Sequence, residues 1–378
     1  MTGIDRPSVD RQFIGLPSPA IGRAGAGNHP LQGIYYTPSG KRPKTALIAS
    51  HYNVDFTEHY MATRMAERGY GFLGWNTRFR GAEHFFTLDH ALAEVGVGVQ
   101  WLRDQGVEQV VLVGNSGGGS LMSAYHSQSR EPNIRAGYGR KKVFEPALNL
   151  PTGDLMIFLA AHPGRPEWIT RTMDPSVLDE TDPNSVDPDL DMYHPDRGPT
   201  YSPEFIERYR AAQIERNHRL TAWCKQQIDA MADRPGRDRI FSMPRTWADL
   251  RYVDATIDPS NRPTPLCYFG EPKHANYGVF GVGVVSTLRT WLNMFSLEES
   301  DCVAAKHLQR LDLPTLVVQP DADTGVFPSD AQGLYDGTAS ADKQLVTLPG
   351  DHYFVEPVDA RDVVADTLAD WLASRTTR

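Results

Sequence analysis

The sequence is poor in cysteine and lacks long hydrophobic runs, and both deficits restrict the kind of protein that it encodes. Its 378 residues include three cysteines, which lie far apart and form no C-x-x-C pair. We therefore expect neither a disulfide framework nor a zinc site, and we expect the protein to reside in a reducing compartment. No run of about 18 apolar residues is present, and Met1–Ala20 lacks the apolar stretch of a signal peptide. We expect a cytoplasmic protein without a membrane-spanning helix.

An excess of positive charge is also missing. The formal net charge is −9 at pH 7, because 47 acidic residues outnumber 38 lysines and arginines. Such a chain is repelled by a nucleic-acid backbone and by an anionic membrane surface. We therefore expect neither a nucleic acid nor a membrane as a partner, although the charge does not identify a substrate. A small-molecule partner is expected, and a homodimer is left open.

Between residues 31 and 162, short apolar runs alternate with helical patterns. The runs are nearly continuous, as in strands that are covered on both faces of a sheet. Strands that alternate with helices indicate a parallel sheet built from βαβ units. The expected strands are Thr45–Ser50, Tyr70–Asn76, Gln109–Gly114 and Leu155–Ala161, and the expected helices are Glu58–Arg68, Leu88–Asp104 and one that begins after Ser116.

The same pattern returns near the C-terminus. Leu316–Gln319 and Gln344–Leu348 are expected strands, and Asp359–Ala373 is an expected amphipathic helix. The predicted fold class is therefore α/β, with a mostly parallel, doubly wound sheet. Residues 1–162 and 304–378 together form its core.

Residues 163–303 interrupt this pattern between the two parts of the core. The first part is rich in proline and acidic residues, which predicts that it is mostly loop. Ser202-Pro203-Glu204 is then typical of an N-cap followed by a first-turn proline, and predicts a long helix to about Ala232. We interpret 163–303 as a helical lid inserted after the sixth strand, and a separate domain is the alternative.

One G-x-S-x-G motif, Gly114-Asn115-Ser116-Gly117-Gly118, directly follows an apolar strand and opens a helical pattern. By itself the motif is weak evidence, because a glycine-rich turn can simply begin a helix. Its position between strand and helix predicts a sharp turn that exposes the serine hydroxyl, with glycines where larger side chains would clash. We therefore predict Ser116 as a nucleophile.

A serine hydroxyl needs a base to remove its proton. Of the 12 histidines, His352 directly follows the last predicted strand, so it should lie at the carboxyl edge of the sheet together with Ser116. His84, His126 and His162 are alternatives near the same edge, but none of them follows the last strand. We predict His352 as the base.

The base in turn needs a carboxylate that orients it and stabilises its protonated form. Two aspartates, Asp321 and Asp323, follow the strand Leu316–Gln319. Either of them could serve, and the other could brace the loop by accepting hydrogen bonds from backbone N–H groups.

The elbow GNSGGG, the loop PDADTGVFP and the C-terminal PGDHYF together resemble the α/β-hydrolase superfamily over nearly the whole chain. The order serine, aspartate, histidine is the one that this fold uses. In relatives the acid comes a few residues after its strand and shortly before a proline. The resemblance therefore favours Asp323, which precedes Pro328, over Asp321.

The resemblance also implies an oxyanion hole and an activity. One N–H donor would come from Gly117, directly after the nucleophile. Relatives have a His-Gly pair after the third strand, where this chain has His51-Tyr52-Asn53, so Tyr52 or Asn53 would supply the second donor. The implied activity is hydrolysis of a carboxylic ester or lactone through an acyl-enzyme, without a metal or an organic cofactor.

Aromatic residues of the predicted lid are expected to line an apolar pocket for a moderately large substrate, although they could equally form the lid's own core. The residues that we assign to substrate binding are His51, His162, Tyr277, Phe280 and Trp291. Two other functions remain as alternatives: hydrolysis of a C–C bond by the same three residues, and a non-catalytic receptor on a hydrolase scaffold. The presence of serine, aspartate and histidine argues against a receptor, which needs none of them.

Overall fold

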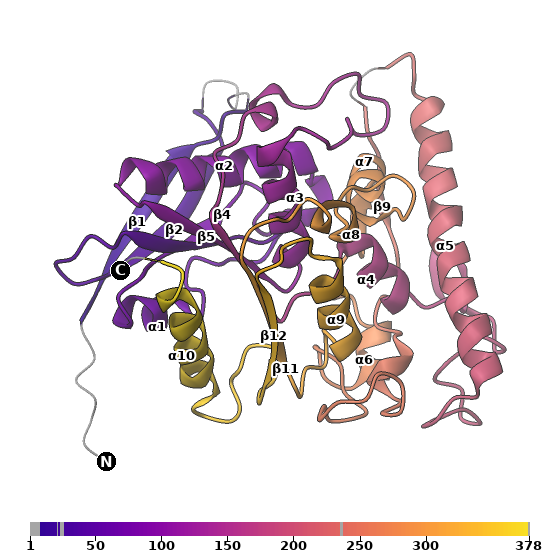
Figure 1. The fold of residues 1–378 in the computed structure, drawn as a ribbon. Helices are drawn as coiled ribbons and strands as arrows, with labels where there is room; N and C mark the ends of the chain where they lie inside the picture. The colour runs from indigo at the N-terminus through magenta and orange to yellow at the C-terminus, as the bar shows by residue number, and fades with distance from the viewer. Residues whose placement is uncertain (1–7, 21, 23–25, 235–236, 377–378) are drawn as a thin grey trace.

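A central sheet of eight strands forms the middle layer of the molecule, with helices on both of its faces (Figure 1). The computed structural model describes residues 8–20, 22, 26–234 and 237–376. The first seven residues of the N-terminal segment considered above therefore lie outside the described residues.

The strand order in this sheet is β1-β2-β4-β3-β5-β6-β11-β12. The strands from β4 to β12 in that order are parallel to one another, whereas β2 is antiparallel to both β1 and β4. The strands are β1 (Val9–Pro17), β2 (Pro30–Pro38), β3 (Thr45–Ala49), β4 (Gly71–Asn76), β5 (Gln109–Asn115), β6 (Leu155–Leu159), β11 (Thr315–Pro320) and β12 (Lys343–Leu348).

The mostly parallel α/β architecture predicted from the sequence is confirmed. All six predicted strands are present, as β3 to β6, β11 and β12. The antiparallel strands β1 and β2 were not predicted. Most of β1 is exposed, and only Ile14 of its nine residues is buried. A strand with one buried residue has no alternation that a sequence pattern can reveal.

Neighbouring residues of the central strands point to opposite faces of the sheet. In β5, Val110 and Leu112 belong to one hydrophobic cluster, whereas Val111 and Val113 belong to the other. Burial on both faces explains why these strands appear as continuous apolar runs. The first cluster includes residues of α2 (Leu88–Asp104) and α3 (Gly118–Arg130), and the second includes residues of α1 (Ala62–Glu67) and α10 (Ala360–Ala373).

The chain between β6 and β11 contains the longest helix, α5 (Pro203–Asp229), which lies on the outside of the molecule in Figure 1. The helix begins where its N-cap was predicted, because the Ser202 side chain accepts a hydrogen bond from the Phe205 N–H. The other elements of this segment after α5 are β9 (Ile240–Ser242), η3 (Leu250–Tyr252), α6 (Pro272–Tyr277), β10 (Val285–Thr287), α7 (Leu288–Thr290), η4 (Trp291–Phe295) and α8 (Ala305–Leu308).

The first part of the same segment was expected to be mostly loop, and most of it is. It contains α4 (Arg165–Thr172) and a short hairpin of β7 (Val177–Asp179) and β8 (Asp182–Val186). Pro166 lies in the first turn of α4, where its missing N–H breaks no helical hydrogen bond, so its presence did not exclude a helix.

Three further elements complete the described fold: η1 (Glu83–Phe85), η2 (Glu145–Leu148) and α9 (Pro328–Gly337). None of the helices in the described ranges combines the length and the apolar composition needed to cross a bilayer.

Candidate active site

Ser116 lies in the tight turn between β5 and α3. Its φ angle is 53°, in the left-handed region that non-glycine residues rarely adopt. The turn packs so closely that a Cβ on Gly118 would lie 2.5 Å from the carbonyl oxygen of Ser50. A Cβ on Gly114 would lie 2.6 Å from the Cα of Gly119. The glycines of the motif are therefore required by the close approach of backbone, and the turn holds Ser116 in a strained conformation at the wall of a cavity.

His352 and Asp323 are joined by a hydrogen bond of 2.7 Å from Nδ1 to Oδ2. The Asp323 side chain is fully buried. Its second oxygen, Oδ1, accepts hydrogen bonds from the backbone N–H groups of Gly325, at 2.7 Å, and Val326, at 3.0 Å. Because the carboxylate accepts the proton on Nδ1, Nε2 is the basic nitrogen of the ring.

The environment of His352 also sets its affinity for a proton. Burial disfavours the charged imidazolium. The negative charge of Asp323 and its hydrogen bond to the ring, together with the charge of Asp351, outweigh burial and raise the pKa of His352 above its ordinary value. The arrangement therefore stabilises the protonated ring, which is the form that a general base reaches when it takes a proton.

Asp321 makes different contacts in the same loop. Its Oδ1 accepts a hydrogen bond of 3.0 Å from the N–H of Gly350, and its Oδ2 accepts one of 2.8 Å from Nδ2 of Asn261. These bonds tie the loop after β11 to the loop after β12 and to the segment between β6 and β11. Of the two aspartates that the sequence left as alternatives, Asp323 is the one that contacts His352.

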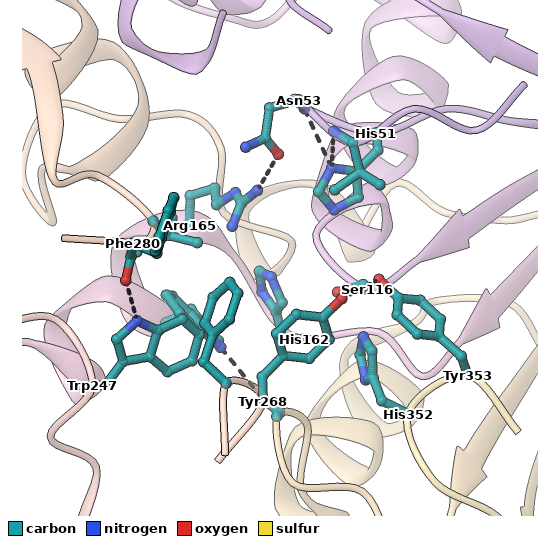
Figure 2. Close-up of a pocket in the computed structure, with 16 residues that line it drawn as sticks. His51, Asn53, Ser116, His162, Arg165, Trp247, Tyr268, Phe280, His352 and Tyr353 are labelled. Carbon is teal, nitrogen blue, oxygen red and sulfur yellow. Dashed lines mark hydrogen bonds between the residues drawn. The ribbon is translucent and has the colours of Figure 1, made fainter. Parts of the chain in front are cut away.

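A cavity of about 430 Å³ is lined by both Ser116 and His352. The close-up in Figure 2 shows their side chains near one another at one side of this cavity, with Tyr353 beside them. The core contributes His51, Asn53, Val54, Ser116, Gly325, His352 and Tyr353 to the lining, and the chain from the end of β6 to β11 contributes His162, Arg165, Trp168, Trp247, Tyr268, Phe269, Phe280, Gly281 and Val282.

Two tyrosines connect these two parts of the lining. The hydroxyl groups of Tyr268 and Tyr353 are 3.2 Å apart, and the Tyr268 ring stands edge-on to the His352 ring. The wall opposite the core is therefore in direct contact with the loop that holds His352.

The His51 ring lies beside the turn that contains Ser116. Its Nδ1 accepts hydrogen bonds from the backbone N–H groups of Asn53, at 3.3 Å, and Val54, at 3.2 Å. The ring proton is therefore on Nε2, which lies 2.9 Å from the position that a Cβ on Gly117 would take. Burial lowers the pKa of His51 well below its ordinary value, and the charge of Arg165 adds to this effect.

Arg165, the first residue of α4, was not predicted as a site residue. It is 3% exposed, lines the cavity, and its Cζ lies 3.2 Å from the position of a Cβ on Gly117. Its position in the sequence contained a signal, because it follows the end of the predicted strand Leu155–Ala161, where side chains reach the same edge of the sheet as Ser116. His162, at the same strand end, also lines the cavity, and burial lowers its pKa well below the ordinary value.

Two residues that we assigned to substrate binding lie elsewhere, so these assignments are corrected. Trp291 is fully buried, and its Nε1 donates to the hydroxyl of Thr221, because it belongs to the packing around α5. Tyr277 stacks on the guanidinium of Arg245, at 4.0 Å, away from the cavity lining. The other three assigned residues, His51, His162 and Phe280, do line the cavity.

The remaining predicted residues have these places. Tyr52 is buried, with its hydroxyl 2.8 Å from Oγ of Ser120. Of the alternative bases, His126 is buried on α3 and contacts the carbonyl oxygen of Arg310, and His84 lies in η1 outside the cavity lining. Within the described ranges, no group of three or more histidine, cysteine, aspartate or glutamate side chains is placed to hold a metal ion.

No protein-family model and no curated protein matches this sequence. Solved structures match over nearly its whole length. The structure of DcsB in complex with its substrate analogue is similar with a TM-score of 0.53, at 11% identity, over 98% of this chain and 100% of that one. A soluble variant of monoglyceride lipase from Saccharomyces cerevisiae gives a TM-score of 0.49, at 12% identity, over 100% of this chain and 98% of that one. The esterase domain of a Rhodothermus marinus protein gives a TM-score of 0.47, at 14% identity, over 97% of this chain and 98% of that one.

At such low identity the likeness concerns the fold alone. The DcsB structure matches 98% of the chain, and the mostly parallel sheet and the tight turn of Ser116 between β5 and α3 are those that the sequence led us to expect. The chain has the α/β-hydrolase fold.

Proposed function

We propose that the protein is a serine hydrolase that cleaves carboxylic esters, with Ser116 as the nucleophile, His352 as the base and Asp323 as the acid. One observation carries the proposal. The strained Ser116 shares a cavity with His352, whose Nδ1 is held by a buried carboxylate at 2.7 Å. A serine beside a histidine whose ring is held by a carboxylate is what nucleophilic catalysis by serine requires.

In the proposed reaction, Ser116 Oγ attacks the ester carbonyl while Nε2 of His352 takes the hydroxyl proton. The tetrahedral intermediate collapses when the protonated His352 gives that proton to the leaving alcohol. A water molecule then attacks the acyl-enzyme and passes a proton to His352. His352 returns this proton to Ser116 Oγ as the bond to the acyl group breaks, and the acid is released. Asp323 accepts the hydrogen bond from Nδ1 and stabilises the imidazolium.

Backbone N–H groups would stabilise the oxyanion of this intermediate. Gly117, directly after the nucleophile, is the first proposed donor. The N–H of Asn53 donates to His51 at 3.3 Å, but Asn53 lines the cavity and Tyr52 does not, so either Tyr52 or Asn53 is the second proposed donor. One such donor contributes roughly 10²–10³ to the rate in comparable sites.

We also propose that residues 163–303 act as a lid that selects the substrate. This segment contributes aromatic side chains to the cavity wall that faces the core, including Trp168, Trp247 and Phe280. An apolar wall with few polar groups suits an ester or lactone with a moderately large apolar portion.

A substrate panel of aryl esters, lactones and vinylogous diketones tests the proposal, together with labelling by a fluorophosphonate. We expect a covalent adduct on Ser116 and turnover of esters. Turnover of the diketones alone would identify a C–C bond hydrolase. The absence of both an adduct and turnover would identify a receptor on a hydrolase scaffold.

A further inference from the structure

Arg165 indicates what kind of ester the cavity takes. We infer that the substrate carries a carboxylate on its acyl portion, a few bonds from the scissile carbonyl, and that Arg165 binds this carboxylate. The inference rests on the proposed hydrolase function and adds a substrate class to it.

The position of the guanidinium is the first argument. A Cβ on Gly117 would lie 3.2 Å from Cζ and 3.3 Å from Nη2 of Arg165. Because Gly117 directly follows Ser116, the positive charge lies beside the place where the substrate carbonyl is attacked. In Figure 2, Arg165 lies with Asn53 and His51 along one wall of the cavity, across from His352.

The second argument is that the guanidinium is buried and only partly paired. Nη2 donates to Oδ1 of Asn53 at 3.1 Å and lies 3.3 Å from Oε1 of Glu83. Nε is buried and has no hydrogen-bond partner within the described ranges. A buried donor without an acceptor is costly, so a site that retains one is suited to a ligand that supplies the acceptor.

The third argument is the charge of the cavity lining. Of the described residues that line it, Arg165 is the one with a permanent charge, and none of the others is a carboxylate. Glu83 is outside the lining and pairs with the guanidinium through Nη2 at 3.3 Å, and the Tyr52 ring lies 5.1 Å from Cζ. The guanidinium is thus held in place while its Nε–H has no acceptor within the described ranges. A carboxylate matches the planar donor pattern of a guanidinium better than a neutral group does.

The test compares two esters that differ in one charge: 4-nitrophenyl hydrogen glutarate and its methyl ester. We expect the wild-type protein to have the higher kcat/KM for the anionic ester. Arg165→Gln should lower the ratio of anionic to neutral kcat/KM by about 10²-fold, since a charge-assisted hydrogen bond is lost, and Arg165→Lys should restore part of it. Equal losses for both esters would overturn the inference and would assign Arg165 to the oxyanion.

Glu83→Gln gives an independent test that leaves Arg165 intact. The amide keeps an oxygen that can accept the hydrogen bond from the Gly283 N–H, now at 3.2 Å, but removes the negative charge that competes for the guanidinium. We expect a lower KM for the anionic ester and the same KM for the neutral ester. A lower KM for both esters, or for neither, would count against the inference.

A binding measurement separates this inference from the proposed function. The mono-anilide of glutaric acid and the corresponding primary amide differ in one charge and contain no ester bond, and calorimetry compares their affinities for wild type and Arg165→Gln. If the acid binds more tightly than the neutral compound and this difference is lost in Arg165→Gln, the inference is supported even if no ester is turned over. The lack of turnover would then contradict only the proposed function. Equal binding of the two compounds would overturn the inference even in an active esterase.

Discussion

Nδ1 of His352 lies 2.7 Å from Oδ2 of Asp323, although the two residues are 29 positions apart in the sequence. α9 and β12 separate them along the chain and bring the loop after β12 back beside the loop after β11. Asp321 reaches across the same two loops but bonds to backbone, through the N–H of Gly350. Two aspartates of one loop thus have separate contacts, which makes their roles distinguishable by mutation.

We expect Asp323→Asn to lower turnover by about 10⁴-fold, because the amide keeps the shape but removes the charge that holds and stabilises the imidazolium. Asp321→Asn should instead lower thermal stability and leave turnover near that of wild type. Steady-state kinetics and thermal unfolding of both variants check this expectation. An inactive Asp321→Asn beside an active Asp323→Asn would reverse the two assignments.

The activity should fall at low pH with an apparent pKa above the ordinary histidine value of about 6.5. The pKa of His352 is raised, so the ring binds its proton at higher pH than a free histidine, and the protonated ring cannot act as a base. Asp323→Asn removes the charge that raises the pKa of His352 but leaves the ring buried, and burial lowers that pKa. The fall in activity at the acidic side of the pH profile should therefore move to lower pH. The measurement is kcat/KM against pH for both proteins. An acid limb at the same pH in both would show that His352 does not control it.

Ser116→Ala should lower kcat by about 10⁴-fold or more, because the attacking oxygen is lost. Alanine keeps a Cβ at the same positive φ, so thermal unfolding should resemble that of wild type. Retention of more than about a tenth of wild-type turnover would exclude Ser116 as the nucleophile.

Phe280→Ala should change the ranking of esters by acyl size, with acetyl esters least affected. Phe280 lines the cavity while its side chain is largely exposed, so its removal changes the pocket more than the stability. Phe85→Ala is the matched control, since Phe85 is also exposed but is not part of the lining. An acyl chain-length series of kcat/KM checks the ranking, and uniform losses along it would mean that Phe280 does not contact the acyl group.

Gly118→Ala should destabilise the protein and abolish activity, because the new Cβ would lie 2.5 Å from the backbone oxygen of Ser50. Gly333→Ala is the control within a helix, as a Cβ there meets nothing within 4 Å. Replacing an unstrained helical glycine by alanine stabilises by about 0.4–1 kcal/mol. Thermal unfolding should therefore shift in opposite directions in the two variants.

Much of the core was predictable because its signals are local. A strand buried on both faces, such as β5, is a continuous apolar run, and the glycines around Ser116 follow from backbone packing within a few residues. The order of residues at strand ends then indicates which side chains share the carboxyl edge of the sheet. This reasoning applies to His352 and, in hindsight, to Arg165.

The cavity wall was less predictable because it depends on packing between distant segments. Trp291 and Phe280 are both aromatic residues of the same stretch of sequence, yet one is fully buried and the other is largely exposed at the cavity. Aromatic residues pack equally well in a core and in a pocket, so residue type alone does not separate the two. The contact between Tyr268 and Tyr353 likewise depends on how the two parts meet.

The pairing of β6 with β11 has a consequence for how the chain reaches its native state. Met156 lies opposite Thr315, about 160 residues further along the chain, so the sheet is completed by a contact between residues far apart in the sequence. During synthesis, β6 emerges well before its partner and presents an unpaired, apolar edge. Folding of the sheet therefore waits for the intervening segment, and intermediates with this edge open are the species most prone to aggregate.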